Sequence, residues 1–172
     1  MPQPTIDPRQ ALLDIYEQAL PAVFGYLLPR CAAVSLAEDL TSETFLAAVD
    51  ALRRDGAPPI STGWLVGVAR HKLVDHWRRQ AREERGLQAV AGTATVADDP
   101  WEQRLDSLCA HRTLQALAPQ HRAALTLRYV DDLPVSEVAA LLDRTLHATE
   151  ALLVRARSAF RDAYLQEEES DA

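Results

Sequence analysis

The sequence predicts an all-α protein made of two small helical domains joined by a flexible linker. Apolar residues recur at helical spacing through most of the 172 residues, whereas alternating runs rich in Val, Ile and Thr and hairpin dipeptides between apolar runs are lacking. Residues 86–100 are small, aperiodic and poor in apolar anchors, which is typical of a linker. One domain is therefore expected over residues 8–85 and another over residues 101–165, followed by an acidic tail at 166–172.

The composition excludes several classes of protein. An apolar fraction of 48% and a charged fraction of 25% describe an ordinary soluble globular chain, and no run approaches the ~18 apolar residues of a membrane span. The N-terminus lacks the apolar core of a signal peptide, so we expect a cytoplasmic protein without direct membrane insertion. Cys31 and Cys109 lack metal-ligand spacing and are expected to be buried thiols, with no disulfide, metal or cofactor.

Charge is unevenly distributed along the chain, whose net charge is −7. Arginine is concentrated in residues 70–85 and again in 155–161, whereas acidic residues gather at 38–43, at 98–99 and in the C-terminal tail. Segregation of this kind suits a protein that has one surface for a polyanion and another for a basic partner.

The N-terminal domain is expected to begin with two amphipathic helices. Apolar spacing predicts the first over Ala11–Leu28, with a kink at Pro21. Ser35 and Glu38 have the spacing of a capping box, which predicts the start of a second helix that runs to about Arg53. Its apolar residues can face a core. The acidic residues expected on its outer face are Glu38, Asp39 and Glu43.

The stretch Trp64–Arg85 predicts a third helix, which follows a loop over residues 54–63 and can be capped by Ser61 or Thr62. It combines one apolar stripe with a cationic face and two indole rings. Such a helix is suited to hold a phosphate backbone and to stack on unpaired bases. This stretch alone fits equally well a core helix whose basic side chains are merely solvated.

The C-terminal domain is expected to contain shorter helices separated by turn signals. Pro119 predicts a break, and Pro134 suits the first turn of a short helix. The expected helical ranges are 101–118, 121–129, 134–142 and about 146–164, with turns at 131–133 and 143–145.

The last two of these helices have the pattern of a helix-turn-helix. In that motif the first helix braces the second, whose N-terminal residues reach base edges in the major groove. Ala139 lies where a close helix–helix approach requires a small side chain. Any three-helix bundle can mimic the pattern. The residues expected at duplex DNA are Thr145, His147, Thr149 and Glu150, with Arg155 and Arg157 further along for phosphates.

Two blocks of the sequence together resemble a known family. AEDLTSETFLAAVDAL followed by WLVGVARHKLVDHWRR resembles region 2 of the extracytoplasmic-function (ECF) group of the sigma-70 family of bacterial RNA polymerase sigma factors. LAPQHRAALTLRYVDDLPVSEVAALLDRT and ALLVRARSAFR resemble region 4 of the same group. The resemblance covers roughly residues 10–165. It implies an all-helical protein of two domains that binds core RNA polymerase and directs it to promoters.

Roles in region 2 follow from this resemblance. Glu38, Asp39 and Glu43 lie in the block that docks on the clamp helices of the polymerase's largest subunit. The 54–63 loop and the start of the next helix match the part that captures an unpaired base of the −10 element, at a cost of a few kcal/mol for base flipping. Trp64 matches a tryptophan that is partly core, whereas Trp77 is expected at the surface because basic residues surround it. The implied −10 residues are Pro59, Ile60, Trp64, Arg70, His71, Lys72, Trp77, Arg78 and Arg79.

The chain departs from the family pattern at several positions. The −10 loop lacks the aromatic residue of many relatives, and His71 stands where the family often has Asn. Asp143 replaces a frequent Gly in the region 4 turn, which is tolerable because Asp visits left-handed backbone conformations more readily than most residues. In the recognition helix, residues 148–152 replace a family pattern with basic and hydroxyl side chains, and neither Glu150 nor Leu152 can donate to phosphate. Either the −35 sequence is unusual or this helix is turned slightly.

The leading hypothesis is therefore a sigma factor, with core RNA polymerase, promoter DNA and an anti-sigma factor as implied partners and a nucleoid association in the holoenzyme. One alternative is a helix-turn-helix regulator that binds duplex DNA without core polymerase, and another is a helical interaction protein. An enzyme is not expected. His71, Asp75 and His76 share a helix, but no third metal ligand, phosphate loop or nucleophile motif accompanies them. Asp75 is more simply an intrahelical partner of Arg78 or Arg79.

Overall fold

The structure is a computed structural model that describes residues 8–54, 56, 58–87 and 107–171. These residues are helices, turns and short connections, and no strand occurs among them. The expected all-α class is confirmed. The chain divides into two compact units, Met1–Leu73 and Val74–Ala172, and the division falls inside α3 (Thr62–Leu87). Most of the expected linker lies outside the described residues, although Gly86 still belongs to α3.

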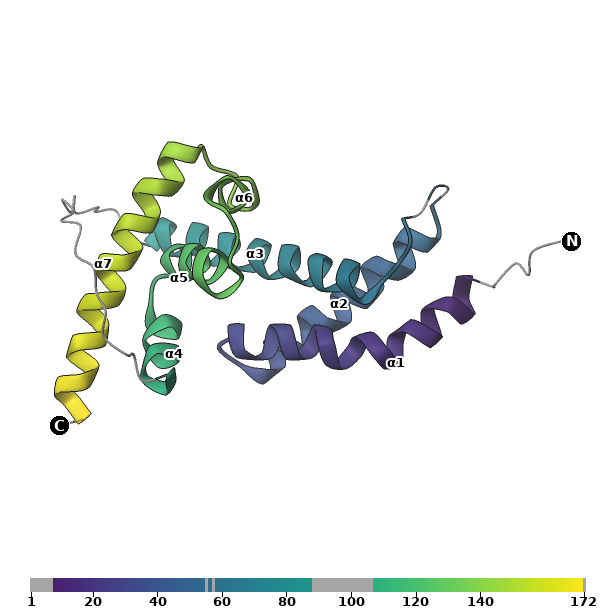
Figure 1. Ribbon diagram of the computed structural model, residues 1–172, viewed down its shortest axis with the longest axis horizontal. Helices are drawn as coiled ribbons and strands as arrows, with labels where there is room; N and C mark the ends of the chain where they lie inside the picture. The colour runs from purple at the N-terminus through teal and green to yellow at the C-terminus, as the bar shows by residue number, and fades with distance from the viewer. Residues whose placement is uncertain (1–7, 55, 57, 88–106, 172) are drawn as a thin grey trace, which may run out of the picture. The chain divides into compact units, whose positions relative to one another are not determined.

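The first unit is built on a helical hairpin. α1 (Pro8–Leu27) and α2 (Val34–Leu52) pack along one another and are joined through η1, a 3₁₀ turn at Leu28–Arg30 (Figure 1). Tyr16 and Phe45 place their ring centroids 4.7 Å apart, a tilted geometry that aromatic pairs favour. The core of this unit contains Ala19, Val23, Leu27, Cys31, Ala37, Leu40, Phe45, Ala48, Leu65, Ala69 and Leu73.

The capping box expected at Ser35 is wrong. α2 begins at Val34, its N-cap is Ala33 in an extended conformation, and no side chain caps the helix. Ser35 therefore already lies in the first turn, where it is no longer placed to accept the hydrogen bond of an N-cap. Helix α1 continues through Pro21, so the expected kink stays a prediction.

The second unit contains the remaining helices. α4 (Ser107–Ala116), α5 (Pro119–Leu125) and α6 (Val135–Leu141) all pack against the long α7 (Leu146–Asp171) (Figure 1). Between α5 and α6 the chain forms η2, a π-helical turn at Thr126–Val130, in which the Asp131 amide donates to the Thr126 carbonyl over 2.9 Å. Pro119 opens α5 rather than only breaking the chain, because its missing N–H costs nothing in a first helical turn.

The connection between α6 and α7 is a Schellman motif. Asp143 has φ of +53°, its amide donates to the Ala140 carbonyl over 3.2 Å, and the Arg144 amide donates to the Ala139 carbonyl over 2.9 Å. These bonds satisfy the last carbonyls of α6. The expected left-handed conformation at Asp143 is confirmed. Ala139 is 5% exposed in the contact between α6 and α7, as its small side chain predicts.

Cys31 and Cys109 are both buried thiols. Within the described residues, no group of three or more His, Cys, Asp or Glu side chains is arranged to hold a metal ion. None of the described helices combines the length and the hydropathy that crossing a membrane requires.

Candidate polymerase and nucleic-acid interface

The acidic residues of α2 form an outer face, as expected. Glu38, Asp39 and Glu43 are exposed, while Leu40 and Phe45 on the opposite side are buried. Thr41 and Thr44 are also buried, and each hydroxyl donates to a backbone carbonyl four residues earlier, over 2.7 Å. Their polar groups are thus satisfied inside the helix, and the carboxylates outside remain available to a basic partner.

The acidic face of α2 lies next to the basic face of α3. The Lys72 ammonium is 3.5 Å from the Glu43 carboxylate, with side-chain exposures of 36% and 52%. An ion pair this exposed stabilises a protein by at most about 1 kcal/mol. The structure thus brings together one residue expected to dock on polymerase and one expected to bind DNA. Breaking this ion pair so that either residue can bind its own partner costs little free energy.

The loop before α3 presents the expected −10 capture residues at the surface. Pro59 is exposed, and Ile60 and Trp64 are half-buried. The Ser61 hydroxyl accepts a hydrogen bond from the Trp64 amide over 3.1 Å, which confirms Ser61 as the cap of this helix. The partial burial of Trp64 agrees with the expectation that it belongs partly to the core.

Arg70 and His71 occupy different environments on α3. His71 is exposed, whereas Arg70 is half-buried with its guanidinium 5.9 Å from the ring centroid of Tyr26. Arg30 lies on the same ring at 4.0 Å, which is cation–π geometry. Sequence reasoning missed this cluster because Arg30 and Tyr26 precede the cationic helix by some forty residues and carry no motif.

The expected exposure of Trp77 is wrong. Its side chain is only 2% exposed and is among the largest buried side chains of the described chain. It extends the apolar stripe of Leu73 and Val74, which are also buried. The flanking basic residues do not bring the ring to the surface, because helix neighbours one position apart point about 100° away from one another. Trp77 is therefore a core residue and cannot stack on a base without unfolding.

Arg78 and Arg79, next along α3, remain at the surface. Arg79 is exposed, while Arg78 is half-buried between two carboxylates. Its guanidinium is 3.6 Å from Asp75, the intrahelical partner expected from the sequence, and 3.2 Å from Asp143 in the turn between α6 and α7.

The start of α7, where the sequence predicts a recognition helix, is capped by a side chain. The Thr145 hydroxyl accepts a hydrogen bond from the Ala148 amide over 3.1 Å, so this side chain acts as the N-cap. His147 and Glu150 are exposed, as expected. Thr149 is not: its side chain is 0% exposed, and its hydroxyl donates to the Thr145 carbonyl over 2.9 Å. The assignment of Thr149 to a DNA surface was therefore wrong.

The two arginines further along α7 are both exposed. Arg157 donates to the Tyr129 hydroxyl over 2.9 Å, which holds its guanidinium against η2. Arg155 has no such bond to a described residue and lies close enough to His121 and Arg144 to repel positive charge on both. Of the residues expected at duplex DNA, Thr145, His147, Glu150, Arg155 and Arg157 are thus exposed, and only Thr149 is buried.

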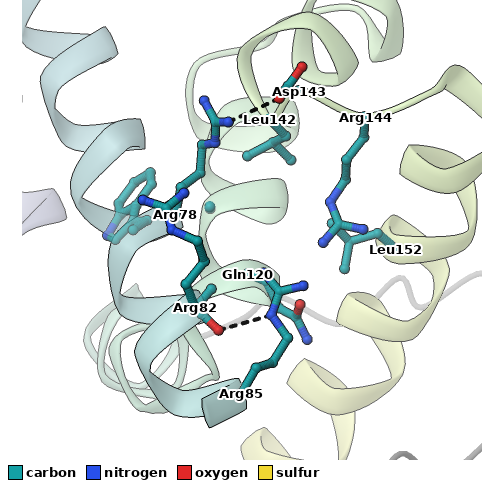
Figure 2. A pocket seen from close by; sticks show the side chains of 11 residues that line it. Arg78, Arg82, Arg85, Gln120, Leu142, Asp143, Arg144 and Leu152 are labelled. Carbon is teal, nitrogen blue, oxygen red and sulfur yellow. Dashed lines mark hydrogen bonds and ion pairs between the residues drawn. The ribbon is translucent and has the colours of Figure 1, made fainter.

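A pocket that sequence reasoning missed lies in the second unit, beside the turn of the helix-turn-helix (Figure 2). Arg78, Arg82 and Arg85 contribute to its wall from α3, and Arg144 contributes from the turn. The spacing of four and then three residues along α3 puts the first three arginines on one helix face. The shared helix face of these three arginines could be predicted from their spacing. The position of Arg144 at the same pocket could not.

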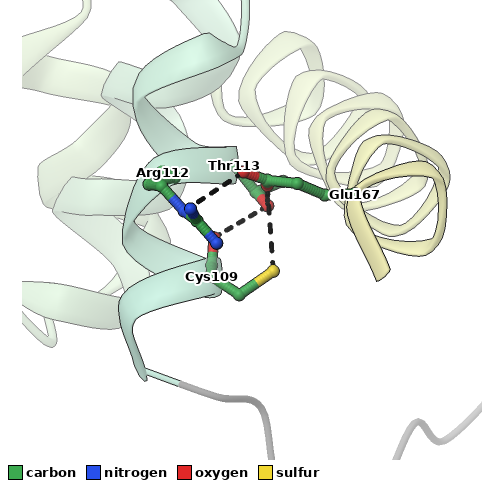
Figure 3. Close-up of polar contacts among 4 residues, drawn as sticks. All are labelled: Cys109, Arg112, Thr113 and Glu167. Atoms are coloured by element: carbon green, nitrogen blue, oxygen red, sulfur yellow. Dashed lines mark hydrogen bonds and ion pairs between the residues drawn. The ribbon is translucent and has the colours of Figure 1, made fainter. Parts of the chain in front are cut away.

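The far end of α7 is attached to α4 by a polar cluster (Figure 3). The Glu167 carboxylate accepts a hydrogen bond from the Thr113 hydroxyl over 2.6 Å and lies 3.3 Å from Nε of Arg112. The Cys109 thiol, 3.8 Å from the same carboxylate, completes the cluster. The expected end of this helix near Tyr164 was therefore too early, since these contacts hold the beginning of the acidic tail in helical form.

His121 of α5 should make the stability of the second unit depend on pH. Burial, and secondarily the positive charge of Arg155, lower the pKa of His121 below its ordinary value. The unfolded chain consequently binds the proton more readily, so the free energy of unfolding should rise as pH increases toward about 6.5 and level off above it.

Urea denaturation across this pH range measures the slope. His121→Gln should flatten it, whereas His111→Gln, which changes an exposed histidine of α4, should not. Equal slopes in all three proteins would contradict the role given to His121.

Comparisons with known proteins identify the family. The Sigma-70 region 2 family model matches residues 15–83, and the Sigma-70 region 4 model matches residues 107–160. The chain is 33% identical over 150 residues to the ECF RNA polymerase sigma factor BldN of Streptomyces coelicolor, with 83% of this chain but 56% of that protein covered. It is 30% identical to the ECF sigma factor SigC of Mycobacterium tuberculosis, with 80% and 73% of the two chains covered.

A solved structure shares the fold. The sigma factor RpoE of Bartonella quintana, in complex with the anti-sigma factor NepR, aligns with a TM-score of 0.53 at 20% sequence identity, covering 90% of this chain and 96% of that one. The regions matched by the two family models correspond to the hairpin with α3 and to the helices α4–α7. The chain belongs to the ECF group of RNA polymerase sigma factors.

Proposed function

We propose that this protein binds core RNA polymerase and directs it to specific promoters as a dissociable subunit without catalytic activity of its own. The observation that carries the proposal is the pairing of two surfaces on one chain. An exposed acidic face on α2 suits a basic partner, and an exposed recognition helix in a Schellman-joined helix-turn-helix suits duplex DNA. The family to which the chain belongs uses both.

The proposed division of labour follows the order of the chain. Residues 8–85 act as region 2, with docking through Glu38, Asp39 and Glu43 and −10 contacts through the 58–61 loop and the exposed cations of α3. Residues 101–165 act as region 4 at the −35 element, and residues 86–100 connect them. Among the −10 candidates, Trp64 supports base capture better than Trp77, since only Trp64 offers part of its indole at the surface.

Run-off transcription tests the proposal. Core bacterial polymerase is given a pool of promoter fragments with and without the full chain, and transcripts are mapped. Transcripts that depend on the protein and share upstream elements support the sigma role. If none depends on it while the protein alone binds duplex DNA, the chain acts instead as a helix-turn-helix regulator.

Charge reversal on α2 should abolish docking. Asp39→Lys combined with Glu43→Lys should lower protein-dependent transcript by at least roughly tenfold, because like charges facing one another at an interface cost several kcal/mol. The matched control is Asp14→Lys with Asp50→Lys, two exposed acidic residues of the same hairpin. Equal loss in both doubles, or in neither, would show that this face is not the docking surface.

An anti-sigma factor is a further proposed partner, and the protein is proposed to act in the cytoplasm, at the nucleoid when part of the holoenzyme. The RpoE structure to which this fold is similar holds an anti-sigma factor. Affinity purification of the tagged full chain from its native cells, with and without excess core polymerase, would test this. A helical partner that polymerase displaces is the expected result, and recovery of polymerase alone would count against it.

A further inference from the structure

The pocket beside the helix-turn-helix is lined mainly by positive charge (Figure 2). It has a volume of about 310 Å³, and all the residues that line it belong to the unit Val74–Ala172. Trp77, Ala123 and Leu152 give it an apolar floor. The polar side chains around it are Arg78, Arg82, Arg85, Arg144, Gln120 and Asp143.

The one carboxylate in this pocket pairs with only one of its four arginines. Asp143 is the one acidic residue among those that line it, its side chain is 82% exposed, and it pairs with Arg78 at 3.2 Å. Arg85 uses its Nε to donate to the Ala81 carbonyl over 3.0 Å, which leaves its terminal nitrogens for another acceptor. Among the described residues, no carboxylate forms an ion pair with Arg82, Arg85 or Arg144.

Positive charge is crowded at this point. Figure 2 shows Arg85 and Arg144 extending from different segments into the same space, with Gln120 beside Arg85. The pKa of Arg144 is lowered by burial and then by repulsion from Arg85 and Arg155. Because Arg82, Arg85 and Arg144 have no carboxylate partner among the described residues, an anion that bridges them would stabilise them.

We propose that this pocket binds a short chain of phosphate groups, such as inorganic pyrophosphate or the phosphates of a free nucleotide. Arginine donates two parallel hydrogen bonds to a phosphate, and arginines from two segments can hold adjacent phosphoryl groups. Gln120 adds an uncharged donor. Because the site joins α3 to the turn before the recognition helix, its occupancy would stabilise the packed form of this unit. The proposal does not depend on the sigma role.

Isothermal titration of the full chain with inorganic pyrophosphate, at constant ionic strength, tests the site. Arg144→Gln and Arg85→Gln should each weaken binding at least tenfold. Arg53→Gln removes the same charge from an exposed position in the other unit and should bind like the unchanged protein. Circular dichroism establishes that each variant is folded. If one variant fails to fold, the other still decides the outcome.

A second arm separates free phosphate chains from the DNA backbone. A short duplex is titrated into the same proteins, with and without saturating pyrophosphate. Pyrophosphate binding that is weakened at least tenfold in both variants and kept in Arg53→Gln supports the site. Absence of binding at millimolar pyrophosphate, equal binding by all variants, or weakening of duplex binding alone would overturn it.

Discussion

Replacing Trp77 by alanine should lower the free energy of unfolding of the second unit by about 3–5 kcal/mol. The indole is 2% exposed and packs where α3 meets the rest of this unit. Removing it eliminates a large apolar area and leaves a cavity that the surrounding helices fill only in part. Urea denaturation followed by circular dichroism measures the change. This would be among the largest effects of any single substitution in the chain.

Two further variants separate burial from base stacking. Trp77→Phe keeps part of the volume and should lose less stability, and it should retain protein-dependent transcription. Trp64→Ala, at a half-buried position, should lose less stability than Trp77→Ala but more transcription from promoters that must be opened. If Trp77→Ala were folded and stable but defective in promoter opening, the buried, structural role given to Trp77 would be contradicted, and a direct contact with DNA would be supported.

Leu127→Ala should destabilise the helix-turn-helix unit by about 2–5 kcal/mol. Leu127 is 0% exposed and lies in η2, the π-helical turn that carries the chain from α5 toward α6. Since α6 packs against α7, the proposed recognition helix, duplex binding at temperatures near the melting point should fall together with stability. The control is Leu108→Ala in α4, whose side chain is 73% exposed.

The outcome is read by thermal denaturation and by duplex binding well below the melting point. At that lower temperature Leu127→Ala should bind DNA almost normally, because the substitution touches no DNA-facing residue. A loss of binding without a loss of stability would mean that η2 itself contacts the duplex, for example through the exposed Tyr129.

Local features of the fold could be predicted from the sequence. Ser61 caps α3, Asp143 adopts the left-handed conformation of the turn, and Asp75 pairs with Arg78. Each depends on residues within a few positions of one another, so the chain's local chemistry determines it. The exposure of the α2 carboxylates follows in the same way from helical periodicity.

Tertiary packing decided whether single aromatic and polar side chains are buried or exposed. Trp77 stands between His76 and Arg78 in the sequence, and Thr149 is itself polar, yet both are buried. Periodicity alone gives a helix a polar and an apolar side, but the width of the buried stripe depends on how many neighbouring helices pack against it. Helix α7 extends past Tyr164 for a similar reason, because Glu167 finds partners on α4.

The sequence by itself determined the fold class, the order of the helices and the family, because these depend on periodicity, turn chemistry and motif blocks. Only the tertiary structure decided which cations share a site. Arg85 and Arg144 are separated by 59 positions, and nothing local brings them together; they meet at a pocket that the buried side chains of Trp77 and Leu152 also line. Apolar burial drives this packing and does not depend on charge. It can therefore bring side chains of like charge close together.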